Sequence, residues 1–357
     1  MYSSSDGGIK GSRIVRVLNG RGLAAVVAIG VLGAVAALVP GAGSAASGTV
    51  AQFRLAAATN PCQGRKSYSI FYATHARPHP FWTPLLKGAT EGSSLTCLRE
   101  TWTQSPGATD FADQVNRAKV GVAEHPDILV VSMANPQAMD STVRDAISKG
   151  ITVINVNAND TRPASQQPKY TSYVGIYDET YTGIAAAKAM LAYKKVKHVV
   201  VSNPSPGAIN VERRVKGFVD SMKAAGVSAD VLNTQFNTAQ VVQTYLVAHP
   251  DTDGFYSTGT GPTGSPAVRA VISQLGLASK IALVGGDPDI TDLQAIQSGS
   301  QIAGITQQQY LQGWFPPIIA RTYLETGMAP LVVSTGPGVV DKSNVDKAVK
   351  LAQLGLR

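Results

Sequence analysis

From Tyr68 onward, short apolar runs alternate with segments of helical periodicity. Strands that alternate with helices predict parallel sheets covered by helices on both faces. The run Ile128-Leu129-Val130-Val131 is apolar throughout, as expected of a strand buried on both sides. The sequence therefore predicts an α/β fold, with strands at Tyr68–Ala73, Leu98–Thr103, Ile128–Met133, Val153–Val156, His198–Ser202, Asp230–Thr234, Gly254–Thr258, Ile281–Gly285 and Ile302–Ile305.

The segments between these strands carry helix signals at their ends. Asp110 precedes one segment as a capping residue would, and Gly150 and Gly226 follow two others. The predicted helices are Phe81–Leu95, Phe111–Glu124, Gln137–Lys149, Glu179–Tyr193, Asn210–Ala225, Ala239–Ala248, Ser265–Leu275, Asp292–Ser298 and Gln308–Glu325. So many strands exceed one compact doubly wound unit, and we expect two Rossmann-like lobes, the second beginning near Val174.

Residues 1–46 have the order of a secretory signal peptide, followed by a loose leader at 47–66. A basic segment precedes the apolar run Leu23–Leu38, and small residues at 44–47 offer a cleavage site. The run has 16 residues, whereas a transmembrane helix needs about 20, which favours cleavage over a retained anchor. No Cys follows the run in a lipobox-like setting. We therefore expect an unlipidated protein in the periplasm or outside the cell.

The charge of the chain argues against a nucleic-acid partner. Cleavage would remove four basic residues and one acidic residue, which lowers the formal net charge from +8 to +5. The remaining charge is diffuse, and no run of Lys and Arg is interleaved with aromatic residues.

The chain contains two cysteines, Cys62 and Cys97. Cys62 lies just before the first predicted strand and Cys97 at the start of the second, and neighbouring parallel strands would bring these ends together. In an oxidising compartment we expect them to form a disulfide, the alternative being two buried thiols.

The loop between the first strand and the first helix carries rings at His75, His79, Phe81 and Trp82. Phe81 and Trp82 could present an aromatic face to a cleft, where the C–H face of a sugar packs well, or could anchor the helix in the core. Pro78 and Pro80 keep the segment out of a helix, so the spacing of the two histidines does not place them on one face for a metal. We predict that all four rings contact a ligand.

Polar side chains follow several predicted strands, at the edge where open α/β sheets bind ligands. The amide of Asn157 can donate to and accept from a diol, unless it forms a turn. The carboxylate of Asp287 can accept from two hydroxyls, because Asp289 is available to cap the next helix. Gln307 follows the last predicted strand. We predict that these three residues bind hydroxyl groups.

Glu212 and Arg213 lie in the first turns of the helix that begins at Asn210. We predict that they also contact the ligand. The alternative is a solvated helix start, where Glu is favoured by the helix dipole.

The sequence has no signature of covalent or metal chemistry. Gly-x-Ser-x-Gly, a glycine-rich phosphate loop with Lys, and Cys-x-x-Cys are all absent. We therefore expect no catalytic residue, metal or cofactor. An exported sugar isomerase or hydrolase would need paired carboxylates, for which Glu212 with Asp287 is the candidate.

Several short motifs, taken in order, resemble the periplasmic sugar-binding proteins of ABC transporters, in the ribose-binding-like group with the type I fold. They are Thr74-His75 with Pro80-Phe81-Trp82, Val174-Gly175, Arg214 with Gly217-Phe218, Gly286-Asp287, Gln307-Gln308 with Tyr310-Leu311-Gln312-Gly313, and Thr335-Gly336-Pro337-Gly338-Val339-Val340. The resemblance runs from Tyr68 to the C-terminus. Asn157-Ala158 replaces an Asp-Arg pair of ribose binders and Glu212 replaces an Arg, which argues against ribose itself.

The resemblance implies two doubly wound parallel-sheet lobes joined by three crossovers. Residues 67–175 and 308–336 would form the N-terminal lobe, and 176–307 and 337–357 the C-terminal lobe. A sugar or polyol would bind in the cleft, with Phe81 and Trp82 stacked on its ring.

The resemblance also implies a monomer whose lobes close about hinges near Val174, Gln307 and Gly336 and which delivers its ligand to a membrane ABC permease. The same shell could instead report a sugar or a furanone-like signal to a chemoreceptor or sensor kinase. DNA-binding repressors of this fold do not match, because the signal peptide stands in place of their helix-turn-helix.

Overall fold

The computed structural model describes residues 62–75, 80–104, 110–235 and 237–357. All of them lie within one compact unit. The predicted signal peptide at 1–46, most of the leader at 47–66, and His79 lie outside these residues. Across the described ranges, no helix combines the length and the apolar character needed to cross a membrane.

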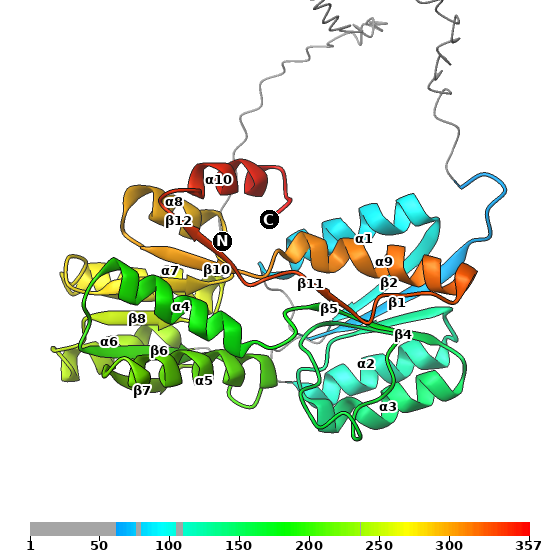
Figure 1. Ribbon diagram of the computed structural model, residues 1–357, viewed down its shortest axis with the longest axis horizontal. Helices are drawn as coiled ribbons and strands as arrows, with labels where there is room; N and C mark the ends of the chain where they lie inside the picture. The colour runs from blue at the N-terminus through cyan, green and yellow to red at the C-terminus, as the bar shows by residue number, and fades with distance from the viewer. Residues whose placement is uncertain (1–61, 76–79, 105–109, 236) are drawn as a thin grey trace, which may run out of the picture. The chain divides into compact units, whose positions relative to one another are not determined.

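The strands form two sheets of six, each with its own helices (Figure 1). Sheet A has the order β11-β5-β4-β3-β1-β2, and sheet B the order β12-β10-β9-β8-β6-β7. The strands of sheet A are β1 (Tyr68–Thr74), β2 (Leu98–Gln104), β3 (Ile128–Val131), β4 (Thr152–Asn157), β5 (Ser172–Gly175) and β11 (Val332–Ser334). The strands of sheet B are β6 (His198–Asn203), β7 (Ser228–Asn233), β8 (Gly254–Ser257), β9 (Ala282–Gly286), β10 (Ala303–Thr306) and β12 (Gly338–Asp341).

The predicted fold of two parallel-sheet lobes is confirmed, with one local exception. Every strand pair in sheet A is parallel, whereas β12 runs antiparallel to β10 at the edge of sheet B. All nine predicted strands form, within a few residues of the predicted ends. The strands β5, β11 and β12, of three or four residues each, were not predicted from the sequence.

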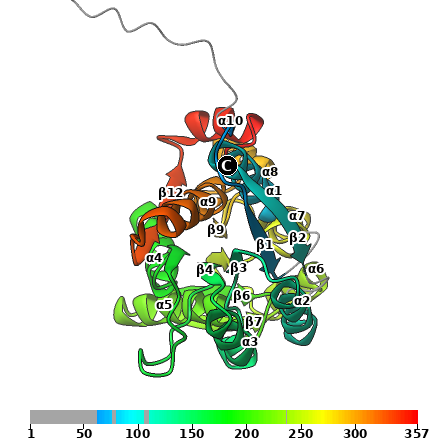
Figure 2. The same cartoon turned by 90° about the vertical axis from the view of Figure 1, so that its right-hand side faces the viewer.

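Helices cover both faces of each sheet, as Figure 2 shows for α4 and α5 against α6 and α7. In sheet A, α1 and α9 pack on one face and α2 and α3 on the other. In sheet B, α4 and α5 pack on one face and α6 and α7 on the other. The helices are α1 (Trp82–Thr96), α2 (Phe111–Ala123), α3 (Pro136–Ser148), α4 (Thr180–Tyr193), α5 (Ile209–Ala224), α6 (Thr238–Ala248), α7 (Ser265–Gln274), α8 (Ile290–Ser298), α9 (Gln309–Thr326) and α10 (Val345–Gln353).

The chain passes between the sheets three times, as expected. It leaves sheet A after β5 to enter α4, and it returns after β10 to enter α9. The third passage joins β11 to β12 through residues 335–337. These three segments adjoin the predicted hinge positions near Val174, Gln307 and Gly336.

Cys62 and Cys97 form a disulfide at one edge of sheet A, with their Cα atoms 5.3 Å apart. The parallel pairing of Tyr68 with Leu98 brings the starts of β1 and β2 together, as the sequence argument required. The bond closes a loop between residues 35 positions apart, which restricts the unfolded chain.

Glycines allow two helix pairs to approach closely. A Cβ atom on Gly217 of α5 would lie 2.1 Å from the carbonyl oxygen of Thr180, and one on Gly183 of α4 would lie 2.0 Å from that of Arg214. On sheet A, a Cβ atom on Gly313 of α9 would lie 1.9 Å from the carbonyl oxygen of Leu85. Because the atoms that block these positions belong to the backbone, they cannot move aside as a flexible side chain could.

We expect Gly217→Ala to destabilise the protein. Alanine favours a helix by about 1 kcal/mol over glycine, but overpacking costs typically about 1–3 kcal/mol, and here the obstacle is backbone. Lys216→Ala, at the exposed neighbouring position, should change stability by less than about 0.5 kcal/mol. Urea denaturation measures both variants, and a Gly217→Ala protein as stable as Lys216→Ala would contradict the close approach.

His198, at the start of β6, lies between carboxylates. Its Nδ1 is 2.8 Å from Asp251 and its Nε2 is 3.1 Å from Asp230, which also accepts from the Tyr245 hydroxyl. The ring of His249 lies 5.9 Å away. Partial burial lowers the pKa of His198, but hydrogen bonds and charge from the two carboxylates outweigh it and raise the pKa above its usual value.

This arrangement predicts a pH-dependent contribution to stability. It should be fully present below the unfolded pKa of about 6.5 and lost as the pH rises through the higher folded pKa. His198→Gln should therefore be less stable than wild type at pH 5.5 and closer to it at pH 8.5. Equal differences at both pH values, measured by thermal unfolding, would count against a charged His198.

Candidate ligand-binding site

A cavity of about 720 Å³, including solvent at its mouth, lies at the carboxyl ends of strands from both sheets. This is where open α/β sheets bind ligands. Its wall residues from the sheet A side are His75, Phe81, Trp82 and Asn157. Those from sheet B and the second crossover are Pro204, Ser205, Ala208, Asn210, Val211, Arg214, Thr258, Gly259, Thr260, Thr263, Asp287 and Gln307.

Two wall residues leave their strands in left-handed backbone conformations. Asn157, the last residue of β4, has φ 65°, and Asp287, directly after β9, has φ 47°. Asn and Asp tolerate this region better than other non-glycine residues. The bend takes both side chains out of the strand alternation. Such strain at a cavity is common where side chains are positioned for binding.

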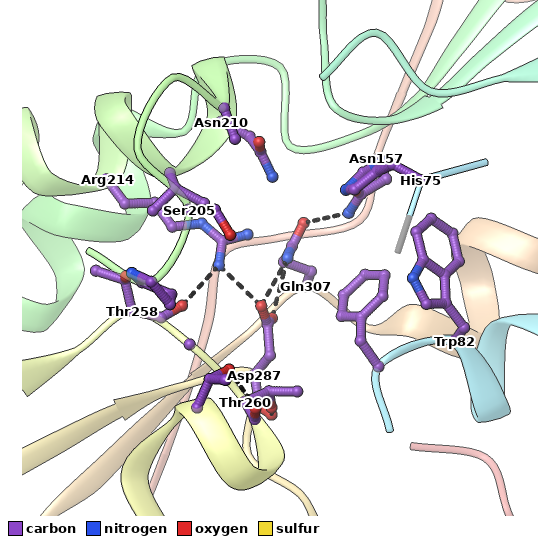
Figure 3. Close-up of a pocket in the computed structure, with 16 residues that line it drawn as sticks. His75, Trp82, Asn157, Ser205, Asn210, Arg214, Thr258, Thr260, Asp287 and Gln307 are labelled. Carbon is purple, nitrogen blue, oxygen red and sulfur yellow. Dashed lines mark hydrogen bonds and ion pairs between the residues drawn. The ribbon is translucent and has the colours of Figure 1, made fainter. Parts of the chain in front are cut away.

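A continuous chain of hydrogen bonds crosses the cavity floor (Figure 3). Asn157 Nδ2 donates to Gln307 Oε1 at 3.2 Å, and Gln307 Nε2 donates to both carboxylate oxygens of Asp287 at 2.9 and 3.0 Å. Arg214 then donates to Asp287 Oδ2 at 2.8 Å. The chain therefore links β4 of sheet A to α5 of sheet B through the second crossover.

The side chain of Gln312, on α9, holds Asn157 and Gln307 in position through further hydrogen bonds. Its Nε2 lies 3.3 Å from Gln307 Oε1 and 3.2 Å from the hydroxyl of Thr335, and its Oε1 accepts from Asn157. One buried amide therefore connects the end of β4 with the second and third crossovers.

Arg214 is a buried cation, with only 3% of its surface exposed. Besides Asp287, it contacts Glu179, to which its Nε and Nη2 donate at 2.9 and 3.1 Å. Burial lowers the pKa of Arg214, but the charges of Glu179 and Asp287 outweigh it and raise the pKa well above the usual value. Burial also raises the pKa of Glu179, which Arg214 and the Thr182 hydroxyl oppose.

Phe81 and Trp82 form the aromatic wall. Their rings meet edge to face at 5.1 Å, and Trp82 also meets His75 at 5.3 Å. Both rings line the cavity and also belong to the core packed by α1 and α9. Phe81 and Trp82 therefore do both things that the sequence left open: they line the cavity and they anchor α1 in the core.

Asn210 is a wall residue with a buried polar atom that is not satisfied. Its side chain is 7% exposed and points from α5 toward the cavity (Figure 3). Within the described ranges, its Oδ1 has no hydrogen-bond partner. Buried polar atoms are generally paired, so this carbonyl is available to a ligand hydroxyl.

The structure brings His75, Phe81, Trp82, Asn157, Asp287 and Gln307 together, but not Glu212 and Arg213. Glu212 accepts from Asn203 and from the backbone of Gly207, so it shapes the loop that carries Ser205. Arg213 pairs with Asp178 at 2.7 Å. His79 lies outside the described residues.

Sequence reasoning did not assign Asn210 and Arg214 to the site, although helical periodicity contains the signal. Both lie on the same face of α5 as buried Val211, Val215 and Phe218, which follow the spacing of one helix face. Glu212 and Arg213 fall between these positions. Thr258 and Thr260, which follow β8, have no comparable signal in the sequence.

No group of three His, Cys, Asp or Glu residues suited to a metal ion occurs in the described parts of the chain. The wall offers neutral amides and hydroxyls, the ion pair of Arg214 with Asp287, and aromatic rings. Such a wall can bind hydroxyl groups and the apolar face of a ring.

Residues 70–327 match the family described as periplasmic binding protein domain. The chain belongs to this family. The expected type I fold and ribose-binding-like group of this periplasmic binding protein are confirmed by the match together with its two-sheet topology.

Relatives and solved structures agree with the family match. The chain is 26% identical over 292 residues to the xylose/arabinose-binding protein XylF of Sulfolobus acidocaldarius, covering 78% of this chain and 72% of that protein. It is 27% identical over 196 residues to the D-ribose/D-allose-binding protein of Pseudomonas aeruginosa, covering 53% and 59%. A carbohydrate transporter from Acidothermus cellulolyticus in complex with myo-inositol superposes with a TM-score of 0.72 at 25% identity, covering 82% of this chain and all of that one.

The buried ion pairs generate a stability prediction. Arg214→Met should cost about 3–5 kcal/mol, because Glu179 and Asp287 would remain buried without their cation. Arg213→Met removes a partly exposed pair and should cost about 0–1 kcal/mol.

Urea denaturation at several pH values checks this. Arg214 lowers the pKa of Glu179 against the effect of burial, so its loss should raise that pKa further. The deficit of Arg214→Met should then be largest at high pH and shrink as the pH falls and Glu179 becomes protonated. Similar losses in the two arginine variants would contradict the central position of Arg214.

Proposed function

We propose that this protein is an extracytoplasmic solute-binding protein that captures a sugar or polyol between its two lobes. The cavity carries this proposal, since an aromatic wall on one side faces a chain of amides and a paired carboxylate on the other. A sugar ring has the matching chemistry, with apolar C–H faces and hydroxyls that both donate and accept. Similarity to a xylose/arabinose-binding protein and to a D-ribose/D-allose-binding protein supports the same class of ligand.

Capture would proceed by lobe closure. Ligand contacts drawn from both lobes favour the state in which the lobes are together. The backbone amide of Ile209 on α5 donates to the carbonyl of Ala134, which follows β3, at 3.1 Å, and so adds a protein contact across the cleft. A shift from mostly open to mostly closed needs about 5.5 kcal/mol of differential binding, and a ligand that touches both walls supplies it.

The closed protein would deliver its ligand to an ABC permease from outside the cytoplasm. Family membership and the transporter relatives support this role. The rival reading as a sugar-modifying enzyme relied on Glu212 with Asp287. Because Glu212 does not line the cavity, that reading loses its paired carboxylates.

Calorimetric titration of the purified protein tests the proposal. The panel is D-xylose, L-arabinose, D-ribose, D-allose, D-glucose and myo-inositol. We expect at least one to bind, and Asn210→Ala to weaken that binding about tenfold, because it removes a buried hydrogen bond worth about 1.4 kcal/mol.

The stability of Asn210→Ala should change little, since its Oδ1 contacts no protein donor in the described ranges. Asn233→Ala, at an exposed position on β7, is the matched control and should bind as wild type does. Absence of binding to every neutral sugar in the panel would refute the proposed function.

A further inference from the structure

A second cavity adjoins the first. Its volume is about 630 Å³, including open solvent, and it shares Phe81, Thr260 and Asp287 with the first cavity. Its other walls come from the starts of α1, α8 and α9 and from the end of α10. A ligand placed against Phe81 in the first cavity therefore has a neighbouring space into which it can extend.

Two polar groups in the second cavity lack partners within the described ranges. Gln309 is 4% exposed, and its Oε1 accepts no hydrogen bond. The Nε of Arg357 donates none. Burial lowers the pKa of Arg357. Buried groups of this kind are normally satisfied, so two residues that line the same space carry one unpaired acceptor and one unpaired donor.

The hydrogen-bonding groups of Gln309 and Arg357 restrict the class of ligand that the second cavity can bind. A hydroxyl can donate to the amide oxygen of Gln309 and accept from Arg357. A carboxylate or phosphate cannot donate to Gln309, and it would face Asp289, whose carboxylate caps α8 at 2.8 Å from the amide of Thr291. An alkyl chain would leave both polar groups unsatisfied. A polyhydroxylated group fits best.

The remaining walls suit a ring with apolar faces. Pro80, Pro84 and Ile290 line the cavity beside these polar groups, and the C–H faces of a sugar pack on such surfaces. The two cavities share Phe81, and each of them has both an apolar surface and groups that can bind hydroxyls.

We propose that the second cavity is a second sugar subsite, and that the ligand of this protein is a disaccharide whose second ring contacts Gln309 and Arg357. This inference rests on the proposed function and specifies its ligand. The first ring would occupy the cavity between the aromatic wall and Asp287.

Calorimetric titrations compare monosaccharides with disaccharides that contain them, including xylobiose, maltose, cellobiose, lactose and melibiose. We expect one disaccharide to bind at least about tenfold more tightly than its component monosaccharide. Gln309→Ala and Arg357→Ala should each remove most of that difference and leave monosaccharide affinity within about twofold. Lys350→Ala, which removes an exposed positive charge from the same helix, α10, is the matched control and should have no effect.

A blocking variant provides a second test. Ala352→Phe places a ring in the second cavity, so disaccharide affinity should fall to the monosaccharide value while the monosaccharide still binds. Monosaccharide binding with no gain for any disaccharide, or an equal loss of both affinities in the variants, would overturn the second subsite alone. Failure of every mono- and disaccharide to bind would overturn the proposed function and this inference together.

Discussion

The buried cation Arg214 is the constraint on which the site depends. Its guanidinium is satisfied by Glu179 at the start of α4 and by Asp287 after β9. A buried ion pair contributes little net stability compared with apolar packing, but it is costly to break. It therefore selects one arrangement of α4, α5 and β9. Gln307 and Asn157 extend this arrangement to sheet A through neutral hydrogen bonds.

The glycine contacts make this arrangement sterically possible. Gly183 lies against the backbone of Arg214, and Gly217 lies against that of Thr180, directly after Glu179. A larger residue at either position would push α4 and α5 apart and separate Arg214 from Glu179. On sheet A, Gly313 lies against Leu85 and brings α9, which follows Gln307, close to the helix that carries Trp82. Both lobes thus use close helix contacts to position side chains at the cavity.

Much of the fold follows from local signals in the sequence. The strands that appear in the sequence as apolar runs of strand length and the helices with clear periodicity were predicted near their observed bounds. The short strands β5, β11 and β12 were not, because they are defined by pairing with distant segments: β11 pairs with β5 across more than 150 residues of chain, and β12 pairs with β10. The helix α10 was also missed, although its buried face packs on α8 and β12.

The residues of the site also divide into those that the sequence could predict and those that it could not. Asn157, Asp287 and Gln307 could be predicted to reach one edge of the sheets, because each follows a strand. The choice of Glu212 and Arg213 over Arg214 was an error of one helix position, which the buried stripe on α5 would have corrected. That Asn210, Gln309 and Arg357 carry unpartnered atoms could not be predicted, because pairing depends on which distant groups come within hydrogen-bond distance.

The distribution of charge explains how such a site can hold a ligand without trapping it. The carboxylate of Asp287 accepts from Arg214 and twice from Gln307, so its oxygens already have partners within the protein, while Glu179 shares the single positive charge of Arg214. Among the described residues that line the first cavity, the buried polar atom without a partner, the Oδ1 of Asn210, is neutral. Neutral hydrogen bonds are weaker than charge-assisted ones, so affinity must come from many contacts made together. Under the proposed lobe closure, such contacts would be lost together when the lobes separate, which would couple binding to closure and release to opening.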